Sequence, residues 1–178
     1  MNQRRSFLKS SVALGSALAL PSLARAAIAA PHERSLRFYN THTGETLRTM
    51  FWAEGQFIPE ALQDINRVLR DHRSNTIATM DPELMLLLNK VSSQFSNHEV
   101  IEVISGYRSP ETNRKLAEAS GGVAKHSMHM EGKAIDIRLP GRDLAQLHQA
   151  ALSLKGGGVG YYPSSRFVHM DTGRVRHW

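Results

Sequence analysis

Residues 127–136 read Ser127-Met128-His129-Met130-Glu131-Gly132-Lys133-Ala134-Ile135-Asp136, and residues 167–171 read Phe167-Val168-His169-Met170-Asp171. Within these stretches, His129, Asp136 and His169 form a set of two imidazoles and one carboxylate, which zinc accepts as ligands in proteins. Three protein ligands leave the fourth tetrahedral position open, as a catalytic zinc requires. The two stretches therefore predict a metal-dependent hydrolase with one Zn²⁺ ion per chain.

Gly132 lies between the first two candidate ligands, so we expect a turn that brings His129, in a loop, over Asp136 on the following strand. His169 on a neighbouring strand would complete the set, and a metal-activated water in the open position would be the nucleophile. Taken singly, each residue has an ordinary alternative: a surface histidine, an aspartate at a strand edge, and a core histidine bonded to a backbone carbonyl.

The pattern Ser-x-His-x-x-Gly-x-Ala-x-Asp, followed by a strand that carries a second histidine, resembles the M15 (LAS-type) zinc peptidases, and among them the DUF882 branch. Residues 105–110 and residues 157–163 add two further matching motifs. These enzymes cut D-amino-acid bonds in peptidoglycan. The resemblance implies an α+β fold with a small antiparallel sheet and flanking helices, of the hedgehog and D-Ala-D-Ala-peptidase type. It also implies zinc as the cofactor and the cross-linked stem peptides of peptidoglycan as the substrate.

Residues 105–110 read Ser105-Gly106-Tyr107-Arg108-Ser109-Pro110 and follow a predicted strand. The tetrahedral intermediate of amide hydrolysis carries negative charge, which a fixed guanidinium stabilises. The resemblance assigns this catalytic role to Arg108, and we expect Arg108 and Tyr107 to bind substrate as well. The alternative for Arg108 is a structural salt bridge at the end of the strand.

His126 lies three positions before His129, where relatives also carry a histidine near the metal. An imidazole at this place can donate to the developing oxyanion or pass a proton to the leaving amine. The alternative is an exposed histidine beside Lys125. Ser127 is expected to bind substrate or to cap the turn.

Asp171 lies two residues after His169, so both side chains point to the same face if the strand continues. Asp171 is therefore expected either to accept the proton of the attacking water or to orient His169. Many M15 relatives carry an acidic residue three positions before the last metal-binding histidine, whereas this chain has Arg166. The departure leaves both roles of Asp171 open.

The N-terminus predicts an export signal. Arg4 and Arg5 form a twin-arginine element, residues 10–20 form a short apolar run, and Ala24-Arg25-Ala26 supplies a cleavage site. Residues 1–29 are thus expected to be a Tat signal peptide that is cut near residues 26–30, and residues 30–178 the catalytic domain. The alternative is an uncleaved anchor. We expect a periplasmic protein that uses the Tat export machinery and has no stable membrane anchor.

The formal net charge of the 178-residue chain is +6, but the signal contributes four basic residues and no acidic one. The mature chain would therefore carry a net charge of about +2, which removes the main compositional support for nucleic-acid binding. The chain contains no cysteine, which excludes disulfides and thiolate metal ligands.

Hydrophobic spacing and turn residues predict the remaining elements. Residues 36–40 and 47–52 flank Thr43-Gly44 and indicate a β-hairpin. Apolar residues at helical spacing predict helices from Pro59 to about His72, and from Pro82 with Asp81 as N-cap. The other expected elements are strands at 100–104, 135–139, 159–162 and 166–170 and helices at 110–119 and 144–154.

These observations together predict a zinc-dependent murein endopeptidase that acts in cell-wall growth and remodelling. Two alternatives remain open at this point. A zinc D,D- or L,D-carboxypeptidase would trim stem peptides and would need a cation, such as Arg108 or Arg166, for a terminal carboxylate. A non-catalytic peptidoglycan-binding module would use zinc structurally.

Overall fold

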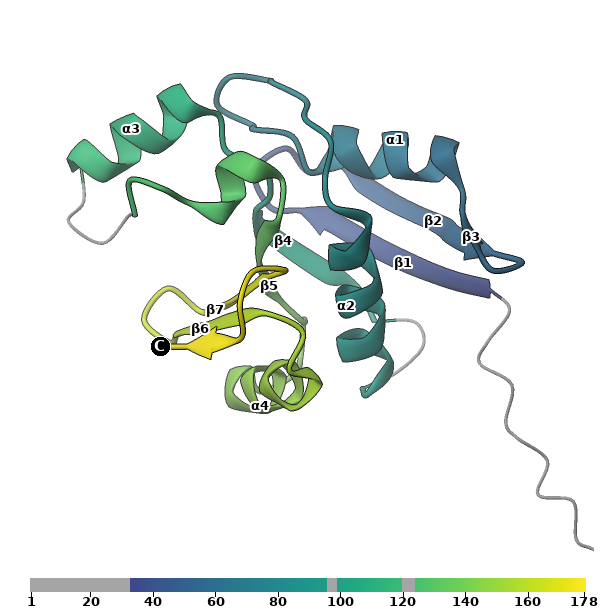
Figure 1. Ribbon diagram of the computed structural model, residues 1–178. Helices are drawn as coiled ribbons and strands as arrows, with labels where there is room; N and C mark the ends of the chain where they lie inside the picture. The colour runs from purple at the N-terminus through teal and green to yellow at the C-terminus, as the bar shows by residue number, and fades with distance from the viewer. Residues whose placement is uncertain (1–32, 96–98, 120–123) are drawn as a thin grey trace, which may run out of the picture. The chain divides into compact units, whose positions relative to one another are not determined.

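The computed structural model describes residues 33–95, 99–119 and 124–178 (Figure 1). The predicted signal peptide lies outside the described residues. The helices are α1 (Pro59–Val68), α2 (Pro82–Ser93), α3 (Pro110–Ala119), α4 (Leu144–Leu154) and the short 3₁₀ helix η1 (Met128–Glu131). The strands are β1 (Glu33–Asn40), β2 (Thr46–Ala53), β3 (Gln56–Phe57), β4 (Ile101–Ser105), β5 (Ala134–Arg138), β6 (Gly158–Tyr162), β7 (Phe167–Asp171) and β8 (Arg176–His177). Among these helices, none has the length and apolar content needed to cross a bilayer.

The strands form one sheet in the order β3-β2-β1-β4-β5-β7-β6-β8. Neighbouring strands are antiparallel except β1 with β4 and β6 with β8, which are parallel. The parallel β1–β4 pair arises because the chain returns from the β2 side of the sheet through α1 and α2, a crossover long enough to reverse the direction. The predicted α+β class is confirmed, while the sheet is larger than expected and mixed.

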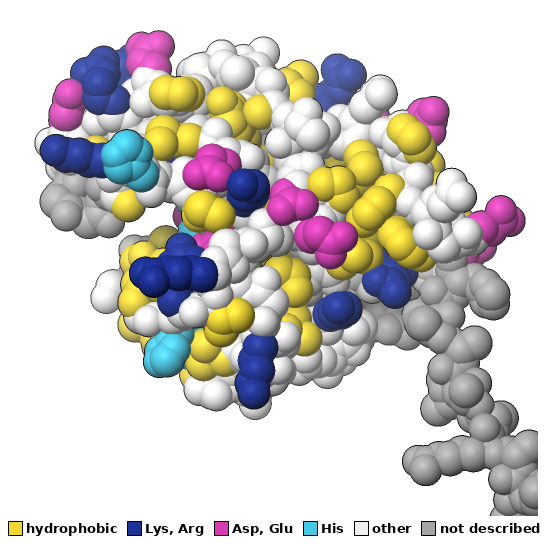
Figure 2. Space-filling model, in the orientation of Figure 1, with side chains coloured by type: hydrophobic (Ala, Val, Ile, Leu, Met, Phe, Trp, Pro, Cys, Tyr) yellow, Lys and Arg dark blue, Asp and Glu magenta, His cyan; other side chains and the backbone are white. Residues whose placement is uncertain are grey.

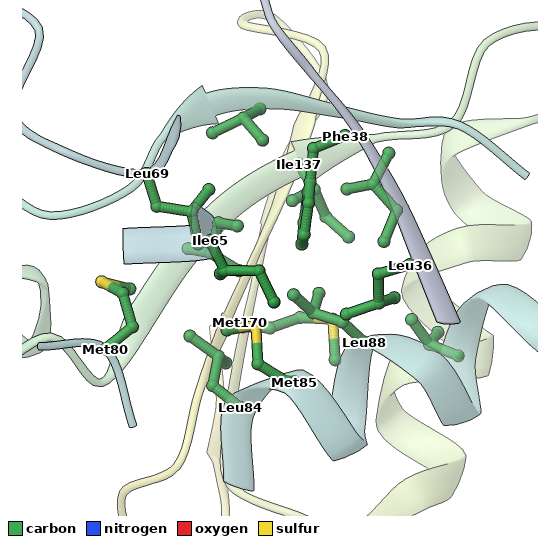
Figure 3. Close-up of a cluster of buried hydrophobic side chains, with 14 of the residues drawn as sticks. Leu36, Phe38, Ile65, Leu69, Met80, Leu84, Met85, Leu88, Ile137 and Met170 are labelled. Carbon is green, nitrogen blue, oxygen red and sulfur yellow. The ribbon is translucent and has the colours of Figure 1, made fainter. Parts of the chain in front are cut away.

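Helices α1, α2 and α4 contribute to one hydrophobic core against the sheet (Figure 3). Side chains along a strand alternate between its two faces. Four residues of β5 and β7 belong to this core: Ile135, Ile137, Val168 and Met170. Asp136 and His169 lie between them in the sequence and therefore project from the opposite face. The helices thus leave that face free for a site.

Aspartate caps fix the N-terminal ends of α2 and α4. Asp81 accepts a hydrogen bond from the N–H of Glu83 at 3.0 Å, and Pro82 occupies the first turn, as predicted. Asp143 accepts from the N–H of Gln146 at 3.0 Å in the same way. These caps fix where each helix begins and so how its apolar face meets the sheet.

The predicted end of α1 is wrong: the helix stops at Val68 instead of about His72. Beyond it, the N–H of Asp71 donates to the carbonyl of Thr76 at 3.0 Å in an isolated bridge. The buried carboxylate of Asp71 accepts a hydrogen bond from the N–H of Ser109, also at 3.0 Å. The loop after α1 is therefore tied to the start of α3, next to Arg108.

Replacing Asp71 tests this tie. Burial opposes ionisation, but hydrogen bonds from Thr112 and Ser109 and from backbone N–H groups lower the pKa of Asp71 below its ordinary 3.8. The stabilisation is thus complete above pH 3.8 and is lost as the pH falls towards the lower folded-state pKa. We expect Asp71→Asn to reduce the unfolding free energy by about 1–3 kcal/mol at neutral pH. Urea unfolding should show this difference narrowing below pH 3.8.

The exposed Asp64 provides the matched control, because Asp64→Asn makes the same chemical change on the surface of α1. This variant should unfold like the parent protein. A difference between Asp71→Asn and the parent that stays constant from pH 7 to pH 3 would contradict the proposed role of the Asp71 carboxylate.

Candidate metal centre

Strands β5 and β7 place two of the three predicted ligands face to face. Asp136 and His169 are direct partners in the antiparallel register of these strands. Their side chains meet on the face of the sheet opposite the core helices α1, α2 and α4, with 2.8 Å between Asp136 Oδ1 and His169 Nδ1. Both residues are buried. The strand register alone therefore brings a carboxylate and an imidazole nitrogen together.

The third ligand comes from η1, which precedes β5. Ser127 caps η1 by accepting a hydrogen bond from the N–H of His129, at 3.4 Å. Gly132 ends it with φ of 69°, a left-handed conformation that glycine adopts without strain, and its Cα lies against the carbonyl of Thr79 with no room for a side chain. His129 thus stands on a short helix instead of the expected loop, and its Nε2 lies 3.3 Å from both Asp136 Oδ1 and His169 Nδ1.

The remaining ring nitrogens are occupied by acceptors. His129 Nδ1 is 2.7 Å from the carbonyl oxygen of Gly106, and His169 Nε2 is 3.0 Å from Asp171 Oδ2. Because both partners accept, these two nitrogens carry the protons. The lone pairs of His129 Nε2 and His169 Nδ1 are then directed at Asp136. One ligand atom from each of the three residues lies within 4.8 Å of the others, so the donor set fits a metal ion.

The carboxylate of this cluster is held in its charged form. Burial opposes ionisation of Asp136, but the neighbouring His129 and His169 outweigh it and lower the pKa of Asp136 well below its ordinary value. Burial also acts on His169, where Asp136 and Asp171 reverse its effect and raise the pKa of the imidazole. The carboxylate of Asp136 is therefore anionic and able to bind a cation.

Asp171 lies behind His169, on the side away from Asp136. It accepts hydrogen bonds from the N–H groups of Gly158 at 3.0 Å and Gly173 at 2.8 Å. The guanidinium of Arg176 donates to both of its oxygens, at 3.0 and 2.7 Å. Of its two predicted roles, this geometry favours the orientation of His169, because every contact holds Asp171 against the ring.

Arg108 reaches the cluster from the loop after β4. Its Nη2 lies 3.7 Å from Asp136 Oδ2 and donates to Ser105 Oγ at 3.3 Å, while Nη1 donates to the buried Asn113 at 3.2 Å. Asn113 also donates to the carbonyls of Ala124 and Lys125. Helix α3 therefore fixes both Arg108 and the segment that leads into His126.

These groups line a cleft of about 360 Å³, with Arg108 and the three candidate ligands on its walls. In Figure 2 this face is hollowed between the surface formed by α3 and η1 and the surface formed by β6 and β7. His126 and Ser127 also line the cleft. The arrangement combines a candidate metal-ligand set, a fixed guanidinium and an exposed imidazole in one cavity, and metal-dependent hydrolysis of an amide can use all three.

Comparison of the sequence with known proteins identifies the family of this chain. The model of the Peptidase_M15_2 family, described as peptidoglycan L,D-endopeptidase MepK, matches residues 28–178. The chain is 42% identical over 177 residues to peptidoglycan L,D-endopeptidase MepK of Escherichia coli (strain K12), covering 99% of this chain and 97% of the relative. It is 41% identical over 178 residues to the probable peptidoglycan L,D-endopeptidase MepK of Haemophilus influenzae, covering 99% and 95%.

The chain belongs to the M15 peptidase family. Membership confirms the resemblance drawn from the sequence motifs and makes the protein a peptidase. Because M15 peptidases depend on a metal, membership also supports a metal at the cluster of His129, Asp136 and His169.

The remaining residues that the sequence singled out do not all line the cleft. Tyr107 is half-buried and packs against the hydrophobic core, not against the cleft, so the structure gives no support for its predicted contact with substrate. Ser127 both caps η1 and lines the cleft, which combines its two alternatives. Arg166, at the place of the acid found in many relatives, lies exposed on the turn between β6 and β7 with φ of 54°.

Several cleft residues escaped the sequence analysis. Tyr162, Phe167, Arg176 and Trp178 form one wall of the cleft. Arg176 and Trp178 could not be assigned from the sequence, because a strand of two residues, such as β8, is too short to show an alternating pattern. Of the two neighbouring tyrosines on β6, Tyr162 lines the cleft, whereas Tyr161 packs against the core.

A substitution of Asp171 tests the support of the metal centre. Asp171→Asn keeps the shape of the side chain but replaces one carboxylate oxygen with an amide that cannot accept from Arg176 and the backbone. We expect affinity for Zn²⁺, measured by competition with a chelating dye, to fall by roughly 10–100-fold. Glu131→Gln is the matched control, since Glu131 is exposed on η1 and pairs with Lys133. Equal affinities for the two variants would contradict the orienting role.

Proposed function

We propose that this protein is a zinc-dependent murein endopeptidase that hydrolyses peptide cross-links of peptidoglycan during cell-wall growth and remodelling. The observation that carries the proposal is the buried cluster of His129, Asp136 and His169 beside Arg108 in an open cleft. The two MepK relatives, which are named as a peptidoglycan L,D-endopeptidase and a probable one, support the same substrate for this chain.

Zinc is the ion that suits this site, with one ion per chain. Two imidazole nitrogens and one carboxylate oxygen, without sulfur, are a ligand set of catalytic zinc sites in other peptidases. When bound, zinc acts as a Lewis acid on the substrate carbonyl and lowers the pKa of a bound water to about 7. The protein would hold the ion through His129, Asp136 and His169.

The side chains around the ligands perform the remaining steps. Arg108, fixed by Asn113 and Ser105, stabilises the negative charge that develops on the carbonyl oxygen in the tetrahedral intermediate. His126 lines the cleft and moves protons between the attacking water and the leaving amine. Asp171 keeps the Nε2 proton of His169 in place, so that His169 Nδ1 stays available as a ligand.

The shape of the surface favours an endopeptidase over a carboxypeptidase. A second hollow of about 540 Å³, lined by α3 residues and by Lys125 and Met130, shares His126 with the cleft. A substrate bound in the cleft can therefore extend past His126 into this second hollow. Of the two cations considered for a terminal carboxylate, Arg108 lies at the reacting centre, where we assign it to the carbonyl oxygen, and Arg166 is not among the residues that line the cleft.

The site of action follows from the substrate. Peptidoglycan lies outside the cytoplasmic membrane, so an enzyme that cuts it acts in the periplasm or beyond. Residues 1–29 would serve as a Tat signal, with residues 30–178 as the exported catalytic domain. The twin arginines Arg4 and Arg5 and the alanines near residue 26 support this route.

Digestion of defined substrates tests the proposed activity. We expect the full-length protein to convert cross-linked muropeptide dimers to monomers with zinc, and to lose this activity with a chelator or in His169→Ala. His148→Ala, which changes a histidine on α4, should remain active. Chromatography of the products separates the alternatives. Shortened stem peptides with intact dimers would establish a carboxypeptidase, and binding to murein sacculi without cleavage would establish a binding module.

A second prediction separates His126 from Asp171 as the proton-transfer group. His126→Ala should lower kcat by about 10²–10⁴-fold without changing affinity for Zn²⁺, because His126 lies outside the ligand set. Lys125→Ala is the neighbouring control and should keep kcat. If His126→Ala has normal kcat while Asp171→Asn loses kcat at saturating zinc, Asp171 is the base and our assignment is wrong.

A further inference from the structure

Trp178, the last residue of the chain, lies in the wall of the cleft and is 49% exposed. A large aromatic side chain that is half exposed forgoes part of the gain from burial, and in the wall of the cleft its apolar surface is available to a bound ligand. We propose that Trp178 is a specificity-determining residue whose ring binds the stem peptide next to the scissile bond. This inference rests on the proposed endopeptidase function.

The backbone of Trp178 is fixed in the sheet. Its N–H donates to the carbonyl of Val159 at 3.3 Å, and its carbonyl accepts from the N–H of Tyr161 at 3.0 Å. These bonds extend the parallel pairing of β8 with β6 to the end of the chain. Trp178 is therefore part of the scaffold that carries the site.

The ring of Trp178 is fixed as well. Its indole N–H donates to the hydroxyl of Tyr162 at 2.7 Å, and the ring of Tyr162 is stacked on Phe167 with 4.5 Å between centroids. The guanidinium of Arg176 lies 4.9 Å from the indole centroid. A Cβ atom at Gly160 would come within 2.7 Å of the indole, so glycine at this position lets the ring lie directly on β6.

The position of the ring identifies what it can bind. The indole centroid lies 5.3 Å from that of His169, one of the three candidate metal ligands. A group that covers the indole therefore lies within a residue or so of the bond being cut. In a peptidoglycan cross-link, those atoms include aliphatic carbons and amide planes of the stem peptide, while the sugars lie further along the chain. Aromatic faces pack well on both kinds of peptide group.

Arg176 supports the indole ring of Trp178, while its own hydrogen-bond donors are directed at Asp171 and not at the substrate. Both of its terminal nitrogens are engaged by Asp171, so the guanidinium is held beneath the indole. The exposed surface of Trp178 thus offers an apolar face with a fixed orientation. Rigid aromatic contacts of this type commonly dominate the binding energy of an interface.

Steady-state cleavage of muropeptide dimers by the full-length, zinc-loaded protein tests the inference. We expect Trp178→Ala to raise KM by about tenfold or more, with kcat changed less than KM. Trp178→Phe keeps an aromatic face and should recover most of the loss. Tyr162→Phe removes only the hydroxyl that holds the indole and should give a smaller increase in KM. Val175→Ala changes a 65% exposed residue of the same tail and is the control.

Affinity for Zn²⁺ and thermal unfolding of each variant distinguish recognition from support of His169. The inference requires both to match the parent protein in Trp178→Phe. An unchanged KM in Trp178→Ala would overturn it, as would a loss of kcat and zinc affinity in Trp178→Phe. If the parent protein cleaves no dimers, the proposed function fails. Calorimetric binding of dimers to the parent and to Trp178→Ala then decides the inference, which equal affinities would overturn.

Discussion

The register between β5 and β7 is the constraint on which the candidate site depends. It sets Asp136 opposite His169, and it does so because Ile137 and Val168 are paired in the same ladder and both lie in the core. A slip of one residue would turn His169 towards the helices and expose its apolar neighbours. The hydrophobic core on one face of the sheet therefore specifies the ligand geometry on the other.

The second constraint acts from the opposite side of the cleft, where backbone contacts hold the segments that carry His129 and Arg108. The N–H of Asp81 donates to the carbonyl of Gly132 at 2.9 Å, which ties the end of η1 to the start of α2. The N–H of Tyr107 donates to the carbonyl of Leu69 at 2.7 Å, which ties the loop after β4 to the end of α1. Loops that carry functional residues are thus anchored on helices packed into the core.

Local signals were sufficient to predict much of this architecture. The alternation around Thr43-Gly44 predicts the β1–β2 hairpin, and Asp81-Pro82 predicts the start of α2, because both depend on residues close in sequence. The ligand set followed from residue types and from a resemblance that spans separated motifs. The structure brings all three expected ligands close to one another, and Arg108 and His126 line the same cleft.

Local sequence patterns could not predict which distant strands pair with each other. The parallel partners β1 and β4 lie about sixty residues apart, and β8 is only two residues long, so neither pairing leaves a periodic trace. The end of α1 was missed because Asp71 leaves the helix to bond Ser109, a residue distant in sequence. The contacts of Asp171 with Arg176 and two backbone N–H groups are likewise set by the folded chain.

The structure explains why this chain can carry Arg166 where many M15 relatives carry an acidic residue. The position three residues before His169 falls on an exposed turn with a left-handed backbone, outside β7, so a side chain there does not share the face of the strand that bears the ligands. The carboxylate on the same face as His169, Asp171, is occupied by Arg176 and by the imidazole. This leaves His126 as the group that we propose for proton transfer, since it is exposed in the cleft and Asn113 of α3 holds its segment. In the mechanism that we propose, strands β6–β8 would orient the ligand His169 and the substrate, and the segments on either side of α3 would supply Arg108 for the oxyanion and His126 for proton transfer.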